Sequence, residues 1–473
     1  MVPDYSALYI DGRWVNPLGD DRVDVVNPAT EERFIRVPCG SAADADRAVQ
    51  AAARALPAWS ATPAAERGQY LAALAGQLRT RVAELTGTIV AELGMPFDAA
   101  RDVQALGAVE ILENYADEIG TVTWEHKLGN SVVVQEPAGV VAAITPWNYP
   151  LYQIAAKAGG ALAAGCTVVI KPSELTPLNA YYLAAAAQAV GLPAGVLNLV
   201  PGTGQEAGEA LAGHRGIDMV SLTGSTRSGR RVAELAARGV KRVALELGGK
   251  SAAIVLDDAD LASAVEHVVR NCYRNSGQSC SAQSRLLVPR DRLPEAAAIA
   301  GASAAAVRLG DPCDHGDHLG PVISDRQRQR VRTLIDQAIA DGCTLVTGGS
   351  AAPAGFGTGY YVQPTVLTDV DRDARIARTE VFGPVLCLIG YDGADDAIAL
   401  ANDTPYGLSA GVWSASTDRA EAVARALRAG EVQVNGAPFN VRAPFGGVKQ
   451  SGYGRELGPY GIMEYLQPKA IHL

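Results

Sequence analysis

The stretch GVVAAITPWNYPLYQIAAKAGGALAAGCTVVIKPSE, residues 139–174, decides the fold class. It holds two short apolar segments, Val140–Thr145 and Thr167–Lys171, which are typical of buried strands, and the residues between them can form one helix. A strand, a helix and a second strand make the repeating unit of a parallel sheet. We therefore expect an α/β fold.

The same alternation continues beyond residue 174, which indicates a doubly wound parallel sheet with ligands at the carboxyl ends of its strands. Further strands are expected at Val196–Val200, Met219–Thr223, Val240–Glu246 and Ala252–Leu256, with helices at Leu178–Val190 and Ser228–Arg238. A second alternating stretch, from about residue 259 to 430, predicts another α/β domain.

The N-terminal 120 residues read as short extended segments followed by helices. Ser41 and Asp44 form a capping-box pattern that opens a helix ending near Pro57. Thr62 and Pro63 mark a second helix start, and helical periodicity continues to about Ile119. Two segments stand apart from both α/β stretches, namely a hairpin over 121–137 and a strand over 464–473. Protruding strands of this kind pair with another subunit.

The length, charge and cysteine content of the chain limit the classes of protein to which it can belong. A chain of 473 residues is too long for one core, so two or three domains are expected. The formal charge of −10 argues against nucleic acid as the main partner. No signal peptide and no membrane span are expected, and scattered cysteines without a CxxC pair favour a reducing cytoplasm. The seven cysteines are residues 39, 166, 272, 280, 313, 343 and 387.

Three short motifs suggest catalysis. Cys280 lies in NSGQSC, residues 275–280, where Gly277 permits a tight backbone; it is either a nucleophile or a buried structural cysteine. Glu246 ends an apolar strand just before two glycines, as a general base or a surface carboxylate. Asn148 lies between two prolines, as a preorganised donor for an oxyanion or a turn residue.

Other motifs suggest a nucleotide site. Lys171 and Glu174 follow a buried strand, where an acid accepts hydrogen bonds from ribose hydroxyls and repels a 2′-phosphate. Gly224 and Ser225 open a helix that can hold a pyrophosphate. The segment 380–384 carries a carboxylate and an aromatic ring two residues apart, on one side of an extended stretch. Gly202, Gly204 and Gly208 match the GxGxxG fingerprint only weakly, and fit a strand–helix turn better.

Together these motifs, in order and spacing, resemble the aldehyde dehydrogenase family over nearly the whole chain, from IDGRW (10–14) and VNPAT (26–30) to PFGGVK (444–449) and SGYGRE (451–456). The resemblance implies an NAD-dependent enzyme in which Cys280 attacks an aldehyde, Asn148 and the Cys280 backbone N–H hold the oxyanion, and Glu246 activates water to hydrolyse the thioester. It also implies cofactor contacts, at Trp147, Lys171, Glu174, Gly224, Ser225, Glu380 and Phe382. Glu174 favours NAD over NADP, although both remain open.

The resemblance implies a Rossmann-like cofactor domain, an α/β catalytic domain and a protruding β oligomerisation arm, hence a homodimer or homotetramer. We divide the chain accordingly into an NAD-binding domain (1–120 and 138–246), a catalytic domain (247–448) and the arm (121–137 and 449–473).

The substrate is expected to be a small-molecule aldehyde. The resemblance points to possible tunnel walls at Tyr149, Tyr152, Gln153, Phe439 and Phe445. Arg274 occupies the place where relatives acting on succinate semialdehyde carry a carboxylate-binding arginine. Their second arginine is replaced by Ala156, so the pair is incomplete, and a capping or surface role for Arg274 is the alternative.

The sequence leaves other functions open. Transfer of the acyl group to coenzyme A is disfavoured by Glu246, which CoA-dependent relatives lack. A thiol esterase and a non-catalytic structural relative are alternatives from other classes. Cys313, His315 and His318 resemble a metal cluster, but their spacing matches no common zinc pattern, so a polar surface loop and no metal are expected.

Overall fold

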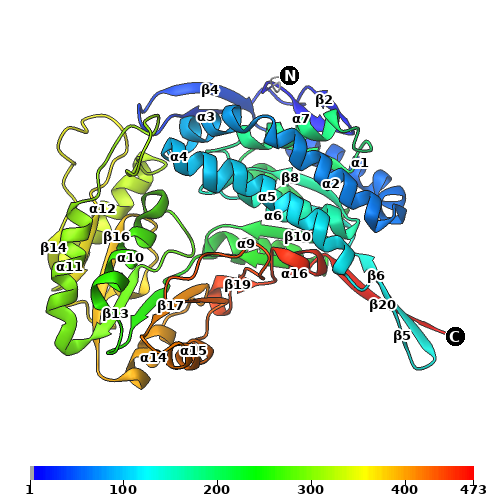
Figure 1. Ribbon diagram of the computed structural model, residues 1–473. Helices are drawn as coiled ribbons and strands as arrows, with labels where there is room; N and C mark the ends of the chain where they lie inside the picture. Colours follow the sequence, from blue (N-terminus) through cyan, green and yellow to red (C-terminus); the bar gives the residue numbers. More distant parts are fainter. Residues whose placement is uncertain (1–4) are drawn as a thin grey trace.

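The computed structural model describes residues 5–473, which form two α/β units and a small sheet that projects from one of them (Figure 1). The first unit contains an eight-stranded sheet in the order β19-β11-β10-β7-β8-β9-β1-β2. Its strands are β1 (Leu8–Ile10), β2 (Arg13–Val15), β7 (Val140–Ile144), β8 (Thr167–Lys171), β9 (Leu197–Leu199), β10 (Met219–Thr223), β11 (Arg242–Glu246) and β19 (Gly452–Tyr453).

The five central strands, from β11 to β9, are parallel, and the outer strands β1, β2 and β19 are antiparallel to their neighbours. From β7 the chain runs first outward to β8 and β9, and then returns to β10 and β11 on the other side. This reversal leaves a crevice at the carboxyl ends of β7 and β10, which is where doubly wound sheets bind ligands.

Helices cover both faces of this sheet because its central strands are apolar on both sides. Val141 and Ala143 face one core, and Val140 and Ala142 face the other. The first face is covered by α2 (Ala64–Arg79), α3 (Val82–Leu93), α5 (Leu106–Glu118), α6 (Pro150–Ala164) and α7 (Leu178–Ala189). The second face is covered by α1 (Ala42–Ala61), α8 (Glu209–Gly213) and α9 (Thr226–Ala237).

The second unit has a seven-stranded sheet in the order β14-β15-β16-β13-β12-β17-β18, parallel except for β14. Its strands are β12 (Ala252–Val255), β13 (Arg285–Pro289), β14 (Thr344–Thr347), β15 (Thr365–Thr368), β16 (Val385–Tyr391), β17 (Ser409–Trp413) and β18 (Glu431–Val434). Its flanking helices are α10 (Leu261–Tyr273) and α11 (Leu293–Ala305) on one face, and α12 (Asp325–Ala340), α13 (Arg375–Arg378), α14 (Ala394–Asn402) and α15 (Thr417–Ala426) on the other.

The remaining elements include a two-stranded ribbon and the projecting sheet. The ribbon pairs β3 (Arg22–Val26) with β4 (Arg33–Pro38), and α4 (Phe97–Ala99) and α16 (Gly458–Met463) are short helices. The projecting sheet, here called the arm sheet, comprises β5 (Glu125–Leu128), β6 (Ser131–Pro137) and β20 (Leu466–His472).

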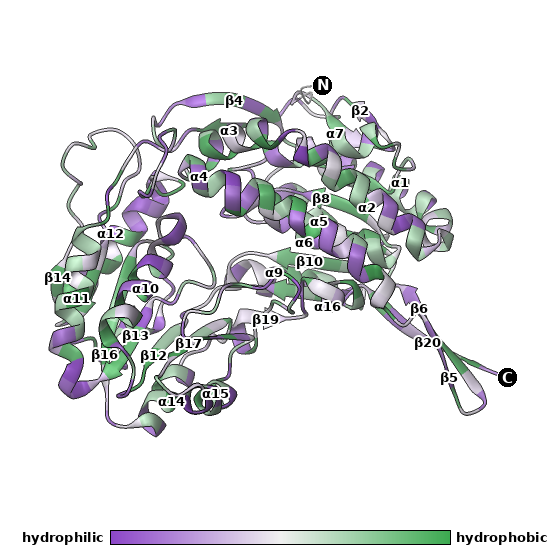
Figure 2. Ribbon diagram, viewed as in Figure 1, coloured by the Kyte–Doolittle hydropathy of each residue, from purple (hydrophilic) through white to green (hydrophobic). Residues whose placement is uncertain are grey.

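The arm sheet confirms the expected hairpin and C-terminal strand, which pair with each other along β6 (Figure 1). Figure 2 shows hydrophobic residues along this sheet. Leu128 and Ile471 on it are exposed, as is Leu473 directly after β20. The sequence assigns all of 449–473 to the arm, but β19 pairs with β11 in the first sheet. The arm strand therefore begins only at Leu466.

Two helix boundaries differ from the prediction. The first helix passes through Pro57 and ends at Ala61, because burial of Trp59 in the core outweighs the hydrogen bond that proline removes. Thr62 closes this helix, with its hydroxyl donating to the Ala58 carbonyl at 3.1 Å, and does not cap the next one. The expected capping box of Ser41 and Asp44 is present. Within residues 5–473, no helix has the length and apolarity needed to cross a bilayer.

Candidate functional site

The loop before Cys280 turns sharply through three left-handed residues after α10. Asn275, Ser276 and Gly277 have φ angles of +51°, +55° and +74°. A Cβ on Gly277 would lie 2.1 Å from the backbone carbon and oxygen of Gly383, so only glycine fits here. The tight backbone expected at Gly277 is thus real, and it presents Cys280 as a half-buried side chain between the two units.

Buried amides hold this loop in place. The Gln278 side chain donates to the Asn275 carbonyl at 3.0 Å and accepts from the Ile323 N–H at 2.8 Å. The Ser276 hydroxyl donates to the Gly320 carbonyl at 2.7 Å. A loop with this many satisfied polar groups is fixed rather than mobile, which is what positions a reactive side chain.

Asn148 lies just beyond β7, against the same loop. Its side-chain amide donates to the Gln278 carbonyl at 3.0 Å, and its own carbonyl accepts from the amides of Gln104 and Asn275, each at 3.0 Å. An amide nitrogen carries two hydrogens. One hydrogen anchors Asn148 to the Cys280 loop, which leaves the other available as a donor.

Glu246 ends β11 and is only 3 % exposed, yet neither of its carboxylate oxygens has a hydrogen-bond partner within residues 5–473. Burial, followed by the negative charge of Glu456, raises its pKa well above the ordinary value, while the charges of Lys157 and Arg455 act in the opposite direction. A buried carboxyl with a raised pKa and free oxygens has the properties of a general base.

The thiol of Cys280 is disfavoured as a thiolate in this state. Burial raises its pKa first, and the negative charges of Glu380, Glu246 and Glu431 raise it further, whereas the Ser281 backbone N–H lowers it. The protein at rest therefore holds a neutral thiol. Its activation requires an adjacent base or a positive charge brought into the site.

The predicted nucleotide contacts lie along the carboxyl ends of the first sheet. Lys171, at the end of β8, is buried and donates to the Gly202 carbonyl at 2.8 Å and to the half-exposed Glu174 at 3.4 Å. Ser225 caps α9 with its hydroxyl and is exposed at the start of that helix, directly after Gly224. An open helix N-terminus beside a cation and an acid fits a diphosphate and a ribose.

Glu380 and Phe382 line one cleft of the second unit, next to the Cys280 loop, but they do not lie on an extended segment as predicted. Phe382 has a φ of +60°, so the chain turns there, because Gly383 and Pro384 follow immediately. Glu380 accepts from the Gly249 N–H at 3.1 Å, and burial raises its pKa to about 7. The ring of Phe382 meets that of Trp147 edge-on, with centroids 5.3 Å apart. The two side chains still belong to one site.

The four aromatic residues predicted to contact the substrate form two pairs of rings. Tyr149 and Tyr152 contact each other, with ring centroids 6.3 Å apart, and Phe439 meets Phe445 at 5.9 Å. Burial raises the pKa of Tyr149, whereas its hydrogen bond with the Ser279 hydroxyl lowers it. The charge of Arg274 also lowers this pKa and that of Cys280 raises it, so Tyr149 lies close to the nucleophile. Of these four rings, that of Tyr149 is linked to Cys280 by the charge that acts on it.

Two other predicted substrate residues differ in character. Gln153 is buried, and its side-chain oxygen accepts from the Thr223 hydroxyl at 3.1 Å, so it supports β10 as well as the wall. Arg274 lies at the C-terminus of α10 and is exposed, and within residues 5–473 no hydrogen bond or ion pair engages its guanidinium.

Sequence reasoning missed a buried ion pair behind Glu246. Lys157 donates to Glu456 at 2.5 Å and to the Ser221 hydroxyl at 3.2 Å, and the Tyr465 hydroxyl also donates to Ser221 at 3.0 Å. Lys157 is the only charged residue in the apolar helix α6. A lone cation in a buried helix signals a buried partner, so it could have been found from the sequence.

The Cys313 segment is a loop with ordinary partners. His315 contacts Asp98 at 3.1 Å, and both ring nitrogens of His318 face backbone carbonyls, at 2.9 and 3.1 Å. In the part of the chain that the structure describes, no three His, Cys, Asp or Glu side chains are grouped so as to hold a metal ion.

The chain is similar to known proteins over nearly its whole length. The model of the aldehyde dehydrogenase family matches residues 14–471. A 3-succinoylsemialdehyde-pyridine dehydrogenase of a Pseudomonas species is 46 % identical over 99 % of this chain and 98 % of its own length. A geranial dehydrogenase of Castellaniella defragrans is 41 % identical, over the full length of both chains.

Solved structures give the same result. Aldehyde dehydrogenase C of Pseudomonas syringae, a mutant solved with NAD+ and octanal, has a TM-score of 0.98 and 48 % identity, covering 99 % of this chain and 98 % of its own. An aldehyde dehydrogenase of Mycobacterium tuberculosis, solved with NAD+, has a TM-score of 0.97 and 41 % identity, covering 100 % and 99 %. The chain belongs to the aldehyde dehydrogenase family. It is accordingly an oxidoreductase that acts on aldehydes, with a Rossmann-like unit and a catalytic unit.

Proposed function

We propose that the enzyme oxidises an aldehyde to a carboxylic acid with NAD, through a thioester on Cys280. The single observation that carries this proposal is the convergence of Cys280, Asn148 and Glu246 at the junction of the two units. Each of them carries the property that its role requires.

In the first step the Cys280 sulfur forms a bond to the aldehyde carbon, and its proton leaves to a nearby base. The carbonyl oxygen becomes an oxyanion, which the free hydrogen of the Asn148 amide and the Cys280 backbone N–H stabilise. When NAD is bound, it supplies the acceptor for the hydride that leaves this carbon. As the hydride leaves, the carbon–oxygen double bond re-forms, and the product is a thioester on Cys280.

In the second step a water molecule attacks the thioester carbon, the carbon–sulfur bond breaks, and the carboxylic acid leaves. Glu246 takes the proton from this water. Its raised pKa and its unpartnered oxygens support the role. Water is favoured over coenzyme A as the acyl acceptor because a base capable of activating it is present.

For the cofactor, we assign the adenosine ribose to Lys171 and Glu174 and the diphosphate to Gly224 and Ser225 at the start of α9. The nicotinamide ribose is assigned to Glu380, with Phe382 and Trp147 beside it. NAD is preferred over NADP because the Glu174 carboxylate repels a 2′-phosphate. Glu174→Gln is expected to raise kcat/KM with NADP relative to NAD, and an unchanged ratio would reject this assignment.

The substrate class that the walls favour is an aldehyde with an extended apolar or aromatic body. Tyr149, Tyr152, Phe439 and Phe445 provide neutral contacts, with Gln153 at their base. Arg274 is a candidate for binding a polar group at the far end of the substrate. The octanal in the Pseudomonas syringae relative is compatible with this class.

The arm sheet is proposed to join subunits into a dimer or tetramer, because its exposed strands carry hydrophobic residues. Residues 1–120, 138–246 and 449–465 are proposed as the NAD-binding domain, 247–448 as the catalytic domain, and 121–137 with 466–473 as the oligomerisation arm. The seven cysteines are all free, which fits a reducing compartment such as the cytoplasm.

The test is NADH formation with a panel of aliphatic, aromatic and carboxylate-bearing aldehydes. Cys280→Ala should abolish NADH formation, while Cys313→Ala, which changes an exposed cysteine, should leave it unchanged. Steady turnover by Cys280→Ala would contradict the mechanism. Ester hydrolysis that proceeds at full rate without NAD, in the absence of any NADH formation, would favour a thiol esterase.

A further inference from the structure

A second polar cavity lies in the catalytic unit, between the start of β12, the C-terminal end of α14 and the start of β17. Its cavity volume is about 20 Å³, which is room for one small ion or water molecule, and it is partly open to solvent. Its walls include Lys250, Ser251, Arg285, Thr404 and Arg428. None of these residues has a role in the proposed reaction.

Lys250 is the unusual wall residue. It is only 1 % exposed, and its Nζ has no hydrogen-bond partner within residues 5–473. The neighbouring hydroxyl of Ser251 is also buried and unpartnered there. Leaving a buried ammonium group without a partner costs several kcal/mol, so such groups are normally paired. Two buried donors without a protein partner within residues 5–473 therefore lie at this cavity, where a bound acceptor would satisfy them.

Arg285 places a second positive charge on the same wall. It is 3 % exposed and donates to the backbone carbonyls of Lys250, Leu400 and Ala401, each at 2.8 Å. In the described part of the chain, no carboxylate oxygen lies within 4.0 Å of the side-chain nitrogens of Lys250 or Arg285.

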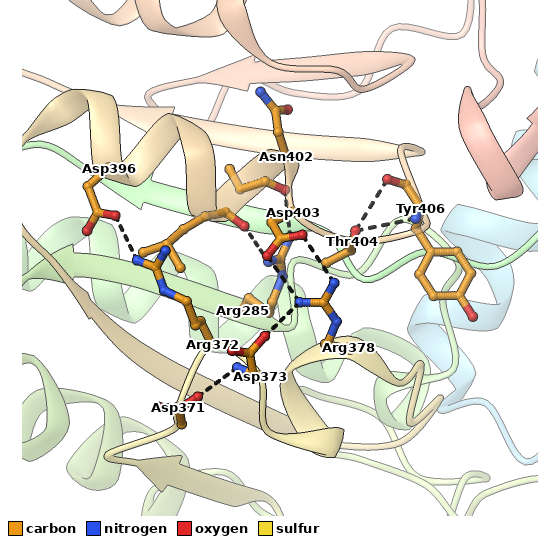
Figure 3. Close-up of polar contacts among 12 residues, drawn as sticks. Arg285, Asp371, Arg372, Asp373, Arg378, Asp396, Asn402, Asp403, Thr404 and Tyr406 are labelled. Carbon is orange, nitrogen blue, oxygen red and sulfur yellow. Dashed lines mark hydrogen bonds and ion pairs between the residues drawn. The ribbon is translucent and has the colours of Figure 1, made fainter.

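Two carboxylates in the surroundings, those of Asp403 and Glu380, have other partners. Asp403 forms two bonds of 3.1 Å with Arg378, which also contacts Asp373 (Figure 3). Glu380 accepts from the Gly249 N–H. Glu380 and Asp403 act on Lys250 and Arg285 only at longer range, so within residues 5–473 neither cation has a direct carboxylate partner.

We propose that this cavity binds a small inorganic anion of chloride size, with Lys250 Nζ and the Ser251 hydroxyl as donors and Arg285 as a second positive charge. Such an anion accepts from both donors and offsets the repulsion between the two cations. Burial, and to a smaller degree the charge of Arg285, lower the pKa of Lys250, whereas the charges of Cys387, Cys272 and Glu380 raise it; a bound anion would add to the second group. This site does not depend on the proposed catalytic mechanism.

The test is crystallography of the full-length enzyme after soaking in bromide, which replaces chloride and is located by its anomalous scattering. We expect a bromide peak beside Lys250 in the wild type and none in Lys250→Met. Lys241→Met is the matched control, because Lys241 is a half-buried lysine that already donates to the carbonyls of His214 and Ile217. This control should keep the peak.

Ser251→Ala provides a milder variant in case Lys250→Met does not fold, and it should lower the bromide occupancy at least twofold. A wild-type cavity that holds only water in bromide-soaked crystals would overturn the proposal. A peak of the same height in Ser251→Ala and Lys250→Met would also overturn it.

Discussion

Gly277→Ala tests whether the loop before Cys280 is fixed by its backbone. Two costs follow from the structure. A φ of +74° costs an alanine about 1–2 kcal/mol. Its Cβ would also lie 2.1 Å from the Gly383 backbone, and relieving an overlap in a packed site costs about 1–3 kcal/mol. The free energy of unfolding should therefore fall by about 2–5 kcal/mol.

Gly355→Ala separates the two costs. Gly355 has a φ of +83°, but no atom lies within 4 Å of the position a Cβ would take. This control should lose only about 1–2 kcal/mol. Denaturant unfolding measures both losses, and NADH formation measures activity. Gly277→Ala should also lose activity about 100-fold, because a shift of ~1 Å in a catalytic group has that effect. Equal stability losses in the two variants, with activity retained, would refute this account of the loop.

Three further predictions concern buried polar groups. Asn148→Ala should lower kcat about 10²–10³-fold, because removal of one donor to an oxyanion slows catalysis by that factor. A variant with normal kcat and only a raised KM would contradict this role of Asn148. Glu456→Gln removes a charge that raises the pKa of Glu246, so the acidic limb of the pH–kcat profile should move to lower pH; a shift to higher pH would be inconsistent. Burial raises the pKa of Glu92 from 4.5 to about 8 in the folded protein. The unfolding free energy should therefore fall as the pH rises from 4.5 to 8, by up to ~1.4 kcal/mol per pH unit, and Glu92→Gln should lack this part of the pH dependence. Calorimetry that shows the same pH dependence for both proteins would exclude this role of Glu92.

Regular elements of this fold could be predicted from the sequence. The strands Thr167–Lys171 and Met219–Thr223 match the prediction to the residue, because each is a short apolar run bounded by turn residues. The strand expected at Val240 begins only at Arg242, since Val240 has a φ of +53° and lies in the preceding turn. Boundaries of this kind depend on backbone turns that apolar patterns do not encode.

The residues of the candidate site also differ in whether the sequence could predict them. Cys280, Glu246 and Asn148 could be proposed because each lies in a local motif next to a strand end or a glycine. The amides that hold them could not, because Gln104 contacts Asn148 from another helical segment and the partner of Lys157 lies 299 residues away. Such contacts exist only after the two units have packed. Sequence motifs therefore predict the reacting groups better than the groups that position them.

The most direct test of the mechanism is mass spectrometry of Glu246→Gln after mixing with NAD and one aldehyde. Without a base to activate water, the thioester should accumulate. The account predicts one equivalent of NADH per active site and an acyl group on the peptide that contains Cys280. A normal NADH burst with no adduct, or with an adduct on a residue other than Cys280, would contradict the central role of Cys280.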